Sequence, residues 1–202
     1  MPAIGITGGI STGKSTFCNF LRELLPEAAF FDADEAAHEL VDLTEIREAI
    51  RQEFGPVVFS DAGNLNRAAL RAIVFGDAAK KRALEQILHP RIRRQWNAVA
   101  QKHRNSTAFF FADIPLLYET GGETLCDRVV VVACSRPVQE QRLGERGLAP
   151  DTARQMIDAQ MPLEEKIKRA DHVVWNNGDV KVLREQTELL VDLWRTEKWT
   201  KT

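Results

Sequence analysis

The chain has 202 residues, 44% of them hydrophobic, which suits one α/β domain with an insertion or two small domains. Its formal net charge of −2 gives no sign of bulk binding to nucleic acid or to an anionic membrane. No apolar run approaches the roughly 20 residues of a membrane helix, and we recognise no signal peptide, so we expect a cytoplasmic protein. Three cysteines without metal-ligand spacing are expected to be reduced: Cys18, Cys126 and Cys134.

The first predicted elements are a strand, a glycine-rich loop and a helix. Residues 2–7 are β-prone, and residues 14–25 carry one apolar helical face. Between them GGISTGKS, residues 8–15, matches the phosphate-loop pattern, in which glycines let backbone N–H groups face a phosphate. Lys14 would reach the β- and γ-phosphates and Ser15 would hold Mg²⁺; the alternative is a turn that only joins strand to helix. The predicted nucleotide-binding residues here are Gly9, Ile10, Ser11, Thr12, Gly13, Lys14, Ser15 and Thr16.

Residues 28–31 form the second predicted strand, which ends in Asp32-Ala33-Asp34. If the strand persists, Asp32 and Asp34 point to the same face beside the phosphate loop. One carboxylate could orient Mg²⁺ through water, and the other could accept the proton of an attacking hydroxyl. The alternative, compatible with the first, is that Asp34 caps the following helix.

Helical patterns fill residues 35–105, a stretch too long for a simple crossover between two strands. We therefore predict an inserted helical domain. Inside its last helical run lies His89-Pro90, where proline cannot donate to the carbonyl four residues earlier. A kink or a restart of the helix is expected at this point.

Three more strands are predicted at residues 107–112, 128–133 and 172–175, all continuous apolar runs. Such runs are typical of a parallel sheet that is buried on both faces. We predict an α/β fold: a P-loop NTPase-type, five-stranded parallel sheet flanked by helices, with an inserted helical substrate domain and a small lid. The predicted nucleotide-binding core is 1–34, 106–142 and 169–202, the acceptor domain 35–105, and the lid 143–168.

Polar residues follow the carboxyl ends of the predicted strands, which is where parallel α/β sheets bind ligands. Asp113 resembles a Walker B carboxylate that assists Mg²⁺, although capping of the next turn fits equally well. Arg142 and Arg146 lie one helical turn apart and would neutralise charge as the γ-phosphoryl group leaves. The alternative for both arginines is a solvated face paired with Glu140 and Glu145.

Further motifs run in order along nearly the whole chain. They are ITGGI at 6–10, DAD at 32–34, LNRAAL at 65–70, LHPRI at 88–92, DIPLLYE at 113–119, CDR at 126–128 and QRL at 141–143 with Arg146, then Gln160 and Ala170-Asp171 leading to Asn176. In this combination they resemble the dephospho-CoA kinase family. The family usually has a further glycine where this chain has Ser11. A serine there can still present its backbone N–H to a phosphate if its φ is negative.

The resemblance implies transfer of the γ-phosphoryl group of ATP to the ribose 3′-hydroxyl of dephospho-CoA, with Mg²⁺. We expect small-molecule substrates, no nucleic-acid or membrane partner, and a monomer or weak homo-oligomer. The implied catalytic residues are Asp34, Lys14, Arg142 and Asp32, and the implied metal-binding residues are Ser15, Asp32 and Asp113. Arg142, Arg146, Asn176 and Gly178 would complete the nucleotide site. The implied acceptor-side residues are Asp34, Arg67, His89, Ile92, Pro115, Leu116, Tyr118 and Glu119.

Two alternatives remain open. Another P-loop small-molecule kinase, acting on a nucleoside monophosphate or a small hydroxy acid, is disfavoured only by the motifs of the insertion. A nucleotide-dependent switch is disfavoured by Asp32 and Asp34, because a switch needs no carboxylate that activates a hydroxyl.

Overall fold

The structure, a computed structural model, describes residues 2–60, 63–103, 108–197 and 199. The chain divides into two compact units. Unit 1 comprises Met1–Phe31 and Val99–Thr202, and unit 2 comprises Asp32–Ala98. Unit 2 therefore covers most of the predicted insertion, whereas the predicted lid, residues 143–168, falls within unit 1.

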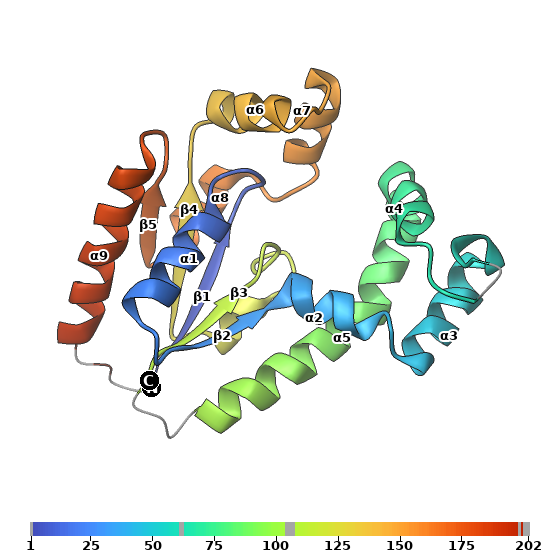
Figure 1. Cartoon of the computed structure of the whole chain (residues 1–202), viewed down its shortest axis with the longest axis horizontal. Helices are drawn as coiled ribbons and strands as arrows, with labels where there is room; N and C mark the ends of the chain where they lie inside the picture. Colours follow the sequence, from blue (N-terminus) through green and yellow to red (C-terminus); the bar gives the residue numbers. More distant parts are fainter. Residues whose placement is uncertain (1, 61–62, 104–107, 198, 200–202) are drawn as a thin grey trace. The chain divides into compact units, whose positions relative to one another are not determined.

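A five-stranded sheet with the strand order β2-β3-β1-β4-β5 organises unit 1 (Figure 1). β1 pairs in parallel with β3 and with β4, and β4 pairs in parallel with β5. The predicted parallel α/β fold is confirmed. The strands are β1 (Ala3–Gly8), β2 (Ala29–Asp32), β3 (Phe110–Asp113), β4 (Arg128–Ala133) and β5 (His172–Trp175).

Helices α1 (Lys14–Leu24) and α9 (Val180–Thr196) lie side by side against this sheet (Figure 1). Both helices have an apolar stripe with helical spacing, and both stripes enter the same core cluster. Trp194 is buried in that cluster, with its ring centroid 5.8 Å from that of Phe111, so it packs on the sheet. The stripe residues are Phe17, Cys18, Leu21, Leu183, Val191 and Trp194.

The last strand, β5, has its backbone paired with a side chain of α9. Trp175 N donates to Gln186 Oε1, and Gln186 Nε2 donates to Trp175 O, both at 3.0 Å. On the other side of the strand, Asn176 N donates to Ala133 O at 2.7 Å. Gln186 therefore satisfies the backbone groups of Trp175 that point away from β4.

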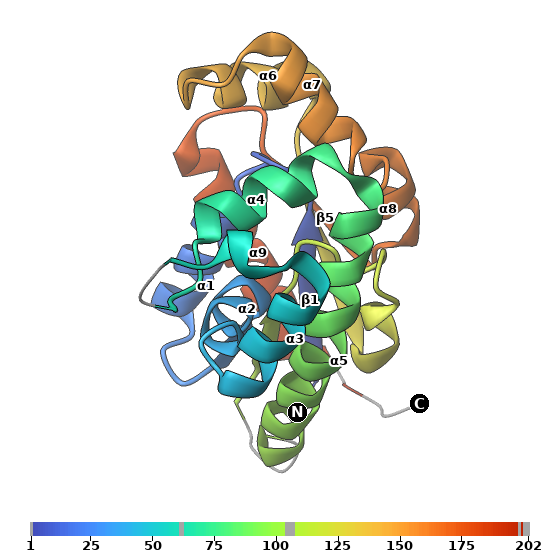
Figure 2. The ribbon, with the colours of Figure 1, turned by 90° about the vertical axis from the view of Figure 1, so that its right-hand side faces the viewer.

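Three short helices follow β4 in unit 1: α6 (Arg136–Glu145), α7 (Pro150–Asp158) and α8 (Leu163–Arg169). Figure 2 shows α6 and α7 packed together, followed by α8. Pro150 opens α7 and Pro162 precedes α8, positions where the missing N–H costs no helical hydrogen bond. The short 3₁₀ helix η2 (Gly122–Leu125) lies between β3 and β4.

Unit 2 consists of α2 (Ala33–Leu40), α3 (Thr44–Phe54), the 3₁₀ helix η1 (Pro56–Val58), α4 (Arg67–Gly76) and most of α5 (Ala78–His103). Its core is a separate cluster of Val41, Ile46, Ile50, Phe54, Val58 and Leu70. α5 is a single helix through Pro90, so the restart does not occur. Leu84, Ile87 and Leu88 pack against the unit 2 core, and these contacts outweigh the hydrogen bond lost at the proline.

The extended backbone does not continue from Asp32 to Asp34. β2 ends at Asp32 and α2 begins at Ala33, so the condition under which Asp32 and Asp34 would point to the same face of a strand is not met. Asp32 Oδ1 accepts from Asp34 N at 2.9 Å and from Glu35 N at 3.0 Å. Asp32, rather than Asp34, is the cap, because its carboxylate satisfies N–H groups that the first helical turn leaves unpaired.

Among the described residues, no helix has the length and hydrophobicity that crossing a bilayer requires.

Candidate active site

The phosphate loop joins β1 to α1 through two residues with positive φ. Gly13 precedes α1 with a φ of 98°, and a Cβ there would lie 2.1 Å from Asn176 Nδ2, so only glycine fits. Ser11 has a φ of 58°, so the condition of a negative φ is not met: the loop keeps the left-handed backbone that a glycine would adopt. That conformation costs a non-glycine residue about 1–2 kcal/mol. The Ser11 hydroxyl is also buried without a hydrogen-bond partner among the described residues.

Two glutamine side chains bind the backbone of Ile10, one at its carbonyl oxygen and the other at its N–H. Gln139 Nε2 donates to Ile10 O at 2.7 Å, and Ile10 N donates to Gln160 Oε1 at 2.8 Å. Neither glutamine was assigned a role from the sequence. Gln139 lies on α6 four residues before the buried apolar residue Leu143, so the two side chains share one face of the helix. A polar residue on this core-facing side was the sequence feature that could have pointed to Gln139.

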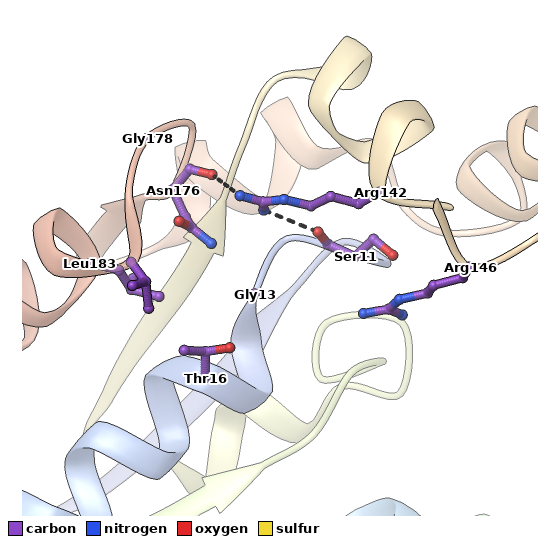
Figure 3. Close-up of a pocket in the computed structure, with 9 residues that line it drawn as sticks. Ser11, Gly13, Thr16, Arg142, Arg146, Asn176, Gly178 and Leu183 are labelled. Carbon is purple, nitrogen blue, oxygen red and sulfur yellow. Dashed lines mark hydrogen bonds between the residues drawn. The ribbon is translucent and has the colours of Figure 1, made fainter. Parts of the chain in front are cut away.

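Arg142 and Asn176 bind the carbonyl groups of Ser11 and Thr12, and Figure 3 shows the bonds of Arg142 to Ser11 and to Asn176. Arg142 Nη1 lies 3.3 Å from both Ser11 O and Thr12 O, and its Nη2 donates to Asn176 O at 3.0 Å. Asn176 Nδ2 donates to Thr12 O at 2.8 Å. The alternative of a solvated arginine face does not describe Arg142, which is half-buried and bound to the loop.

A pocket of about 250 Å³ opens beside the loop, entirely within unit 1 (Figure 3). It joins predicted residues from three distant segments: the phosphate loop, the end of α6 and the turn after β5. Val180 and Leu183 add apolar walls that the sequence reasoning had not assigned to the site. The lining residues are Ser11, Gly13, Thr16, Arg142, Arg146, Asn176, Gly178, Val180 and Leu183.

Lys14 and Asp113 form an ion pair at the foot of the loop. The β-register places Asp113 opposite Ile6, so the carboxylate emerges at the carboxyl edge of the sheet. Asp113 also accepts from the Cys18 thiol at 3.3 Å. Burial and the nearby Asp113 carboxylate raise the pKa of Cys18, which keeps the thiol protonated. Asp113 thus lies at the end of β3 beside the phosphate loop, and its role toward Mg²⁺ stays a prediction.

The segment after β3 carries four residues that were expected to face the acceptor. Pro115 O accepts from Thr7 Oγ1 at 2.9 Å, and Leu116 is half-buried. Tyr118 is buried under the Arg169 guanidinium, 4.2 Å from its ring centroid, and burial raises the pKa of Tyr118 to about 12. Glu119 forms an ion pair with Lys166 at 2.9 Å. Tyr118 and Glu119 are thus engaged in contacts within unit 1, and their acceptor roles stay predictions.

Unit 2 holds the other expected acceptor residues. Asp34 lies in the first turn of α2, and Arg67 begins α4, where its Nη2 donates to His38 O and to Asp42 Oδ2, both at 3.1 Å. His89 and Ile92 lie on α5. Burial lowers the pKa of His89, with Glu85 opposing the shift, so the neutral imidazole is favoured near pH 7. The acceptor roles of these residues also stay predictions.

Comparison with known proteins covers almost the entire chain. The family model for dephospho-CoA kinase matches residues 2–181. A dephospho-CoA kinase of Symbiobacterium thermophilum is 44% identical over 191 residues, which are 93% of this chain and 79% of that protein.

Solved structures agree with the sequence comparison. A crystal structure from Thermus thermophilus has a TM-score of 0.79 at 32% identity and covers 98% of both chains. A dephospho-CoA kinase from Campylobacter jejuni has a TM-score of 0.65 at 26% identity, over 95% of this chain and 96% of that one. With the phosphate loop, the Lys14–Asp113 pair and the adjoining pocket in place, these matches show that the chain belongs to the dephospho-CoA kinase family.

Proposed function

We propose that this chain transfers the γ-phosphoryl group of ATP to the ribose 3′-hydroxyl of dephospho-CoA, giving CoA and ADP. The observation that carries the proposal is the family match over residues 2–181, in a chain whose phosphate loop opens into a suitable pocket. The pocket combines loop N–H groups, two arginines and apolar walls, which suits phosphates at one end and a base at the other.

In unit 1 the reaction needs only binding and charge neutralisation, since a loose phosphoryl-transfer transition state requires little covalent chemistry from the protein. The loop N–H groups and the α1 N-terminus would receive the phosphates. Lys14 would release Asp113 and bind the β- and γ-phosphate oxygens instead. Arg146, at the end of α6 and exposed, is free to swing toward the transferred group, whereas Arg142 also fixes the loop.

Mg²⁺ is compatible with the residues present, provided that the triphosphate and water supply most of its ligands. Among the described residues, no group of three or more His, Cys, Asp or Glu side chains could hold a metal ion. The Ser15 hydroxyl is exposed on the first turn of α1, and the Asp113 carboxylate lies at the end of β3. Such sparse oxygen donors suit Mg²⁺, which retains waters and binds substrate phosphates, and it would neutralise charge on the β- and γ-oxygens.

For the acceptor, the proposal assigns Asp34 to the attacking 3′-hydroxyl, which it would orient or deprotonate, and Asp32 to support of the metal. Arg67, His89, Ile92 and the segment Pro115–Glu119 would contact dephospho-CoA. The family resemblance supports these assignments.

The test measures ADP release with Mg-ATP and a panel of acceptors: dephospho-CoA, AMP, CMP, shikimate and none. We expect fast release only with dephospho-CoA, and mass spectrometry of the product should show one added phosphoryl group. Faster release with another acceptor would identify a different small-molecule kinase. Slow release that no acceptor alters would instead identify a nucleotide switch.

We also propose a cytoplasmic location and a monomeric or weakly homo-oligomeric state. The three cysteines support the location, because all are free thiols and a reducing compartment keeps them so. Cell fractionation and light scattering across a range of protein concentrations would test the two statements.

A further inference from the structure

The side chain of Lys166 is completely buried, unlike those of its neighbours on α8. Lys168 and Arg169 on the same short helix are exposed and pair with Glu165 and Glu123. A fully buried ammonium is rare in proteins and requires a partner for its charge and for each N–H. This lysine therefore has a function that the rest of the helix does not share.

Three acceptors surround the Lys166 ammonium, which has three N–H donors. Its Nζ lies 3.2 Å from Gly8 O, 3.0 Å from Pro115 O and 2.9 Å from Glu119 Oε1. The two carbonyls use two donors and the carboxylate compensates the charge. The cation is fully satisfied, so its position is determined by these three groups.

The acceptors lie where two strands separate below the phosphate loop. The backbone pairing of β1 and β3 ends with Ile114 N donating to Ile6 O at 2.9 Å. Beyond that bond, Gly8 begins the phosphate loop, and Pro115 has no N–H with which to continue the pairing. Lys166 bridges the gap by binding one carbonyl from each segment.

The residues just before α8 reinforce the same contact. Gln160 Oε1 accepts from Ile10 N at 2.8 Å, and Met161 N donates to Glu119 Oε1 at 3.0 Å. The segment 160–166 thus holds the loop backbone at Gly8 and at Ile10, on both sides of Gly9.

We propose that Lys166 is a positioning residue for phosphoryl transfer. Its ammonium, held by Glu119, fixes the Gly8 carbonyl and so aims the N–H groups of the phosphate loop at the nucleotide. The proposal rests on the proposed kinase activity. Small displacements of such donors reduce the rate strongly, and a shift of about 1 Å can cost on the order of 100-fold.

The test compares Lys166→Met, which removes the ammonium at similar length, with Lys168→Met, which removes an exposed lysine two residues away. We expect Lys166→Met to raise KM for ATP and lower kcat, each on the order of tenfold. Lys168→Met should match the wild type. A role in folding alone would reduce the active fraction, and hence Vmax, without altering KM for ATP.

Removing only the lysine leaves the Glu119 carboxylate and the Gly8 and Pro115 carbonyls without their shared partner, which can destabilise the fold. Lys166→Met/Glu119→Gln removes both charges, keeps an oxygen for Met161 N and should restore a wild-type melting temperature. The ADP affinity of this double variant, measured by calorimetry without an acceptor, should still be about tenfold weaker. Unchanged ADP affinity and unchanged KM for ATP in the folded variants would overturn the proposal. Because this calorimetric measurement needs no acceptor, it decides the role of Lys166 even if dephospho-CoA is not the substrate.

Discussion

The positive φ of Ser11 is the least favourable feature of the phosphate loop. A serine there carries the left-handed backbone cost and a buried hydroxyl without a described partner. The Ser11 carbonyl nevertheless accepts from Arg142, so the loop conformation is held by contacts from another helix. The stability of the chain is therefore predicted to depend on this residue.

We predict that Ser11→Gly stabilises the protein by about 0.5–1 kcal/mol, since relief of the left-handed strain exceeds the entropy that glycine adds to the unfolded chain. Urea denaturation would measure the free energy of unfolding. Ser11→Ala is the control, because it removes the hydroxyl and retains the strain. A Ser11→Gly variant less stable than the wild type would contradict this account.

A substitution of Asp34 tests whether this side chain takes part in phosphoryl transfer. If it orients the attacking hydroxyl, Asp34→Asn should lower kcat by about 10²-fold or more with little change in ATP affinity, because its contribution arises in the transition state. Steady-state kinetics and calorimetry with ADP would measure the two quantities. Glu35→Gln, the exposed neighbour, is the matched control. Loss of nucleotide affinity with kcat preserved would make Asp34 a structural residue.

Some residues of the candidate site could be identified from the sequence, and others could not. Lys14 and Asp113 were identified because each follows a recognisable local pattern. Lys166 and Gln139 were not, since their partners Gly8 and Ile10 lie 158 and 129 positions away. A hint for Lys166 was its spacing from Leu163 and Ile167, which places it on the core-facing side of α8.

At the scale of elements, β4 and β5 were the most predictable strands. Both have the bounds expected from the sequence, because in each a run of β-prone apolar residues follows one polar residue, Arg128 or His172. β2 differed, since the side chain of Asp32 offers the backbone a helix cap in place of another extended residue. α5 continued through Pro90 because tertiary packing, which local patterns do not encode, favoured one helix.

The cap of α2 gives a prediction at this scale. Asp32→Ala should destabilise the protein by about 1 kcal/mol, because two N–H groups of the first turn lose their acceptor. Asp32→Asn retains a cap oxygen and should keep the wild-type stability, measured by thermal or urea unfolding. If Asp32 also supports the metal, the Asn variant should be folded but slow, and its kcat should respond to Mg²⁺ concentration. Full activity in Asp32→Asn would limit Asp32 to capping.

At the scale of the whole molecule, the division into two units predicts that the nucleotide and the acceptor protect different segments from amide hydrogen exchange. The nucleotide pocket lies in unit 1, whereas half of the residues assigned to the acceptor lie in unit 2, which has its own core. Mg-ADP alone should slow amide hydrogen exchange in residues 8–16 and 176–183, by up to about 100-fold at 100 times Kd. α3 should be unaffected until dephospho-CoA or CoA is added.

Hydrogen exchange followed by mass spectrometry would resolve these segments. Equal protection of α3 by Mg-ADP alone would show that the units respond as one. Protection of unit 1 alone by CoA would contradict the acceptor roles assigned to the residues of unit 2.

The pairing of Gln186 with Trp175 has a consequence for the protein in concentrated solution. An open sheet edge offers unpaired N–H and C=O groups on which another chain can add a strand, and Val173 and Trp175 of β5 are exposed apolar residues. The Gln186 amide occupies the Trp175 groups as a neighbouring strand would, so this end of the edge is closed to templated growth. One side chain from α9 thereby removes two of the unpaired backbone groups on which another chain could add a strand.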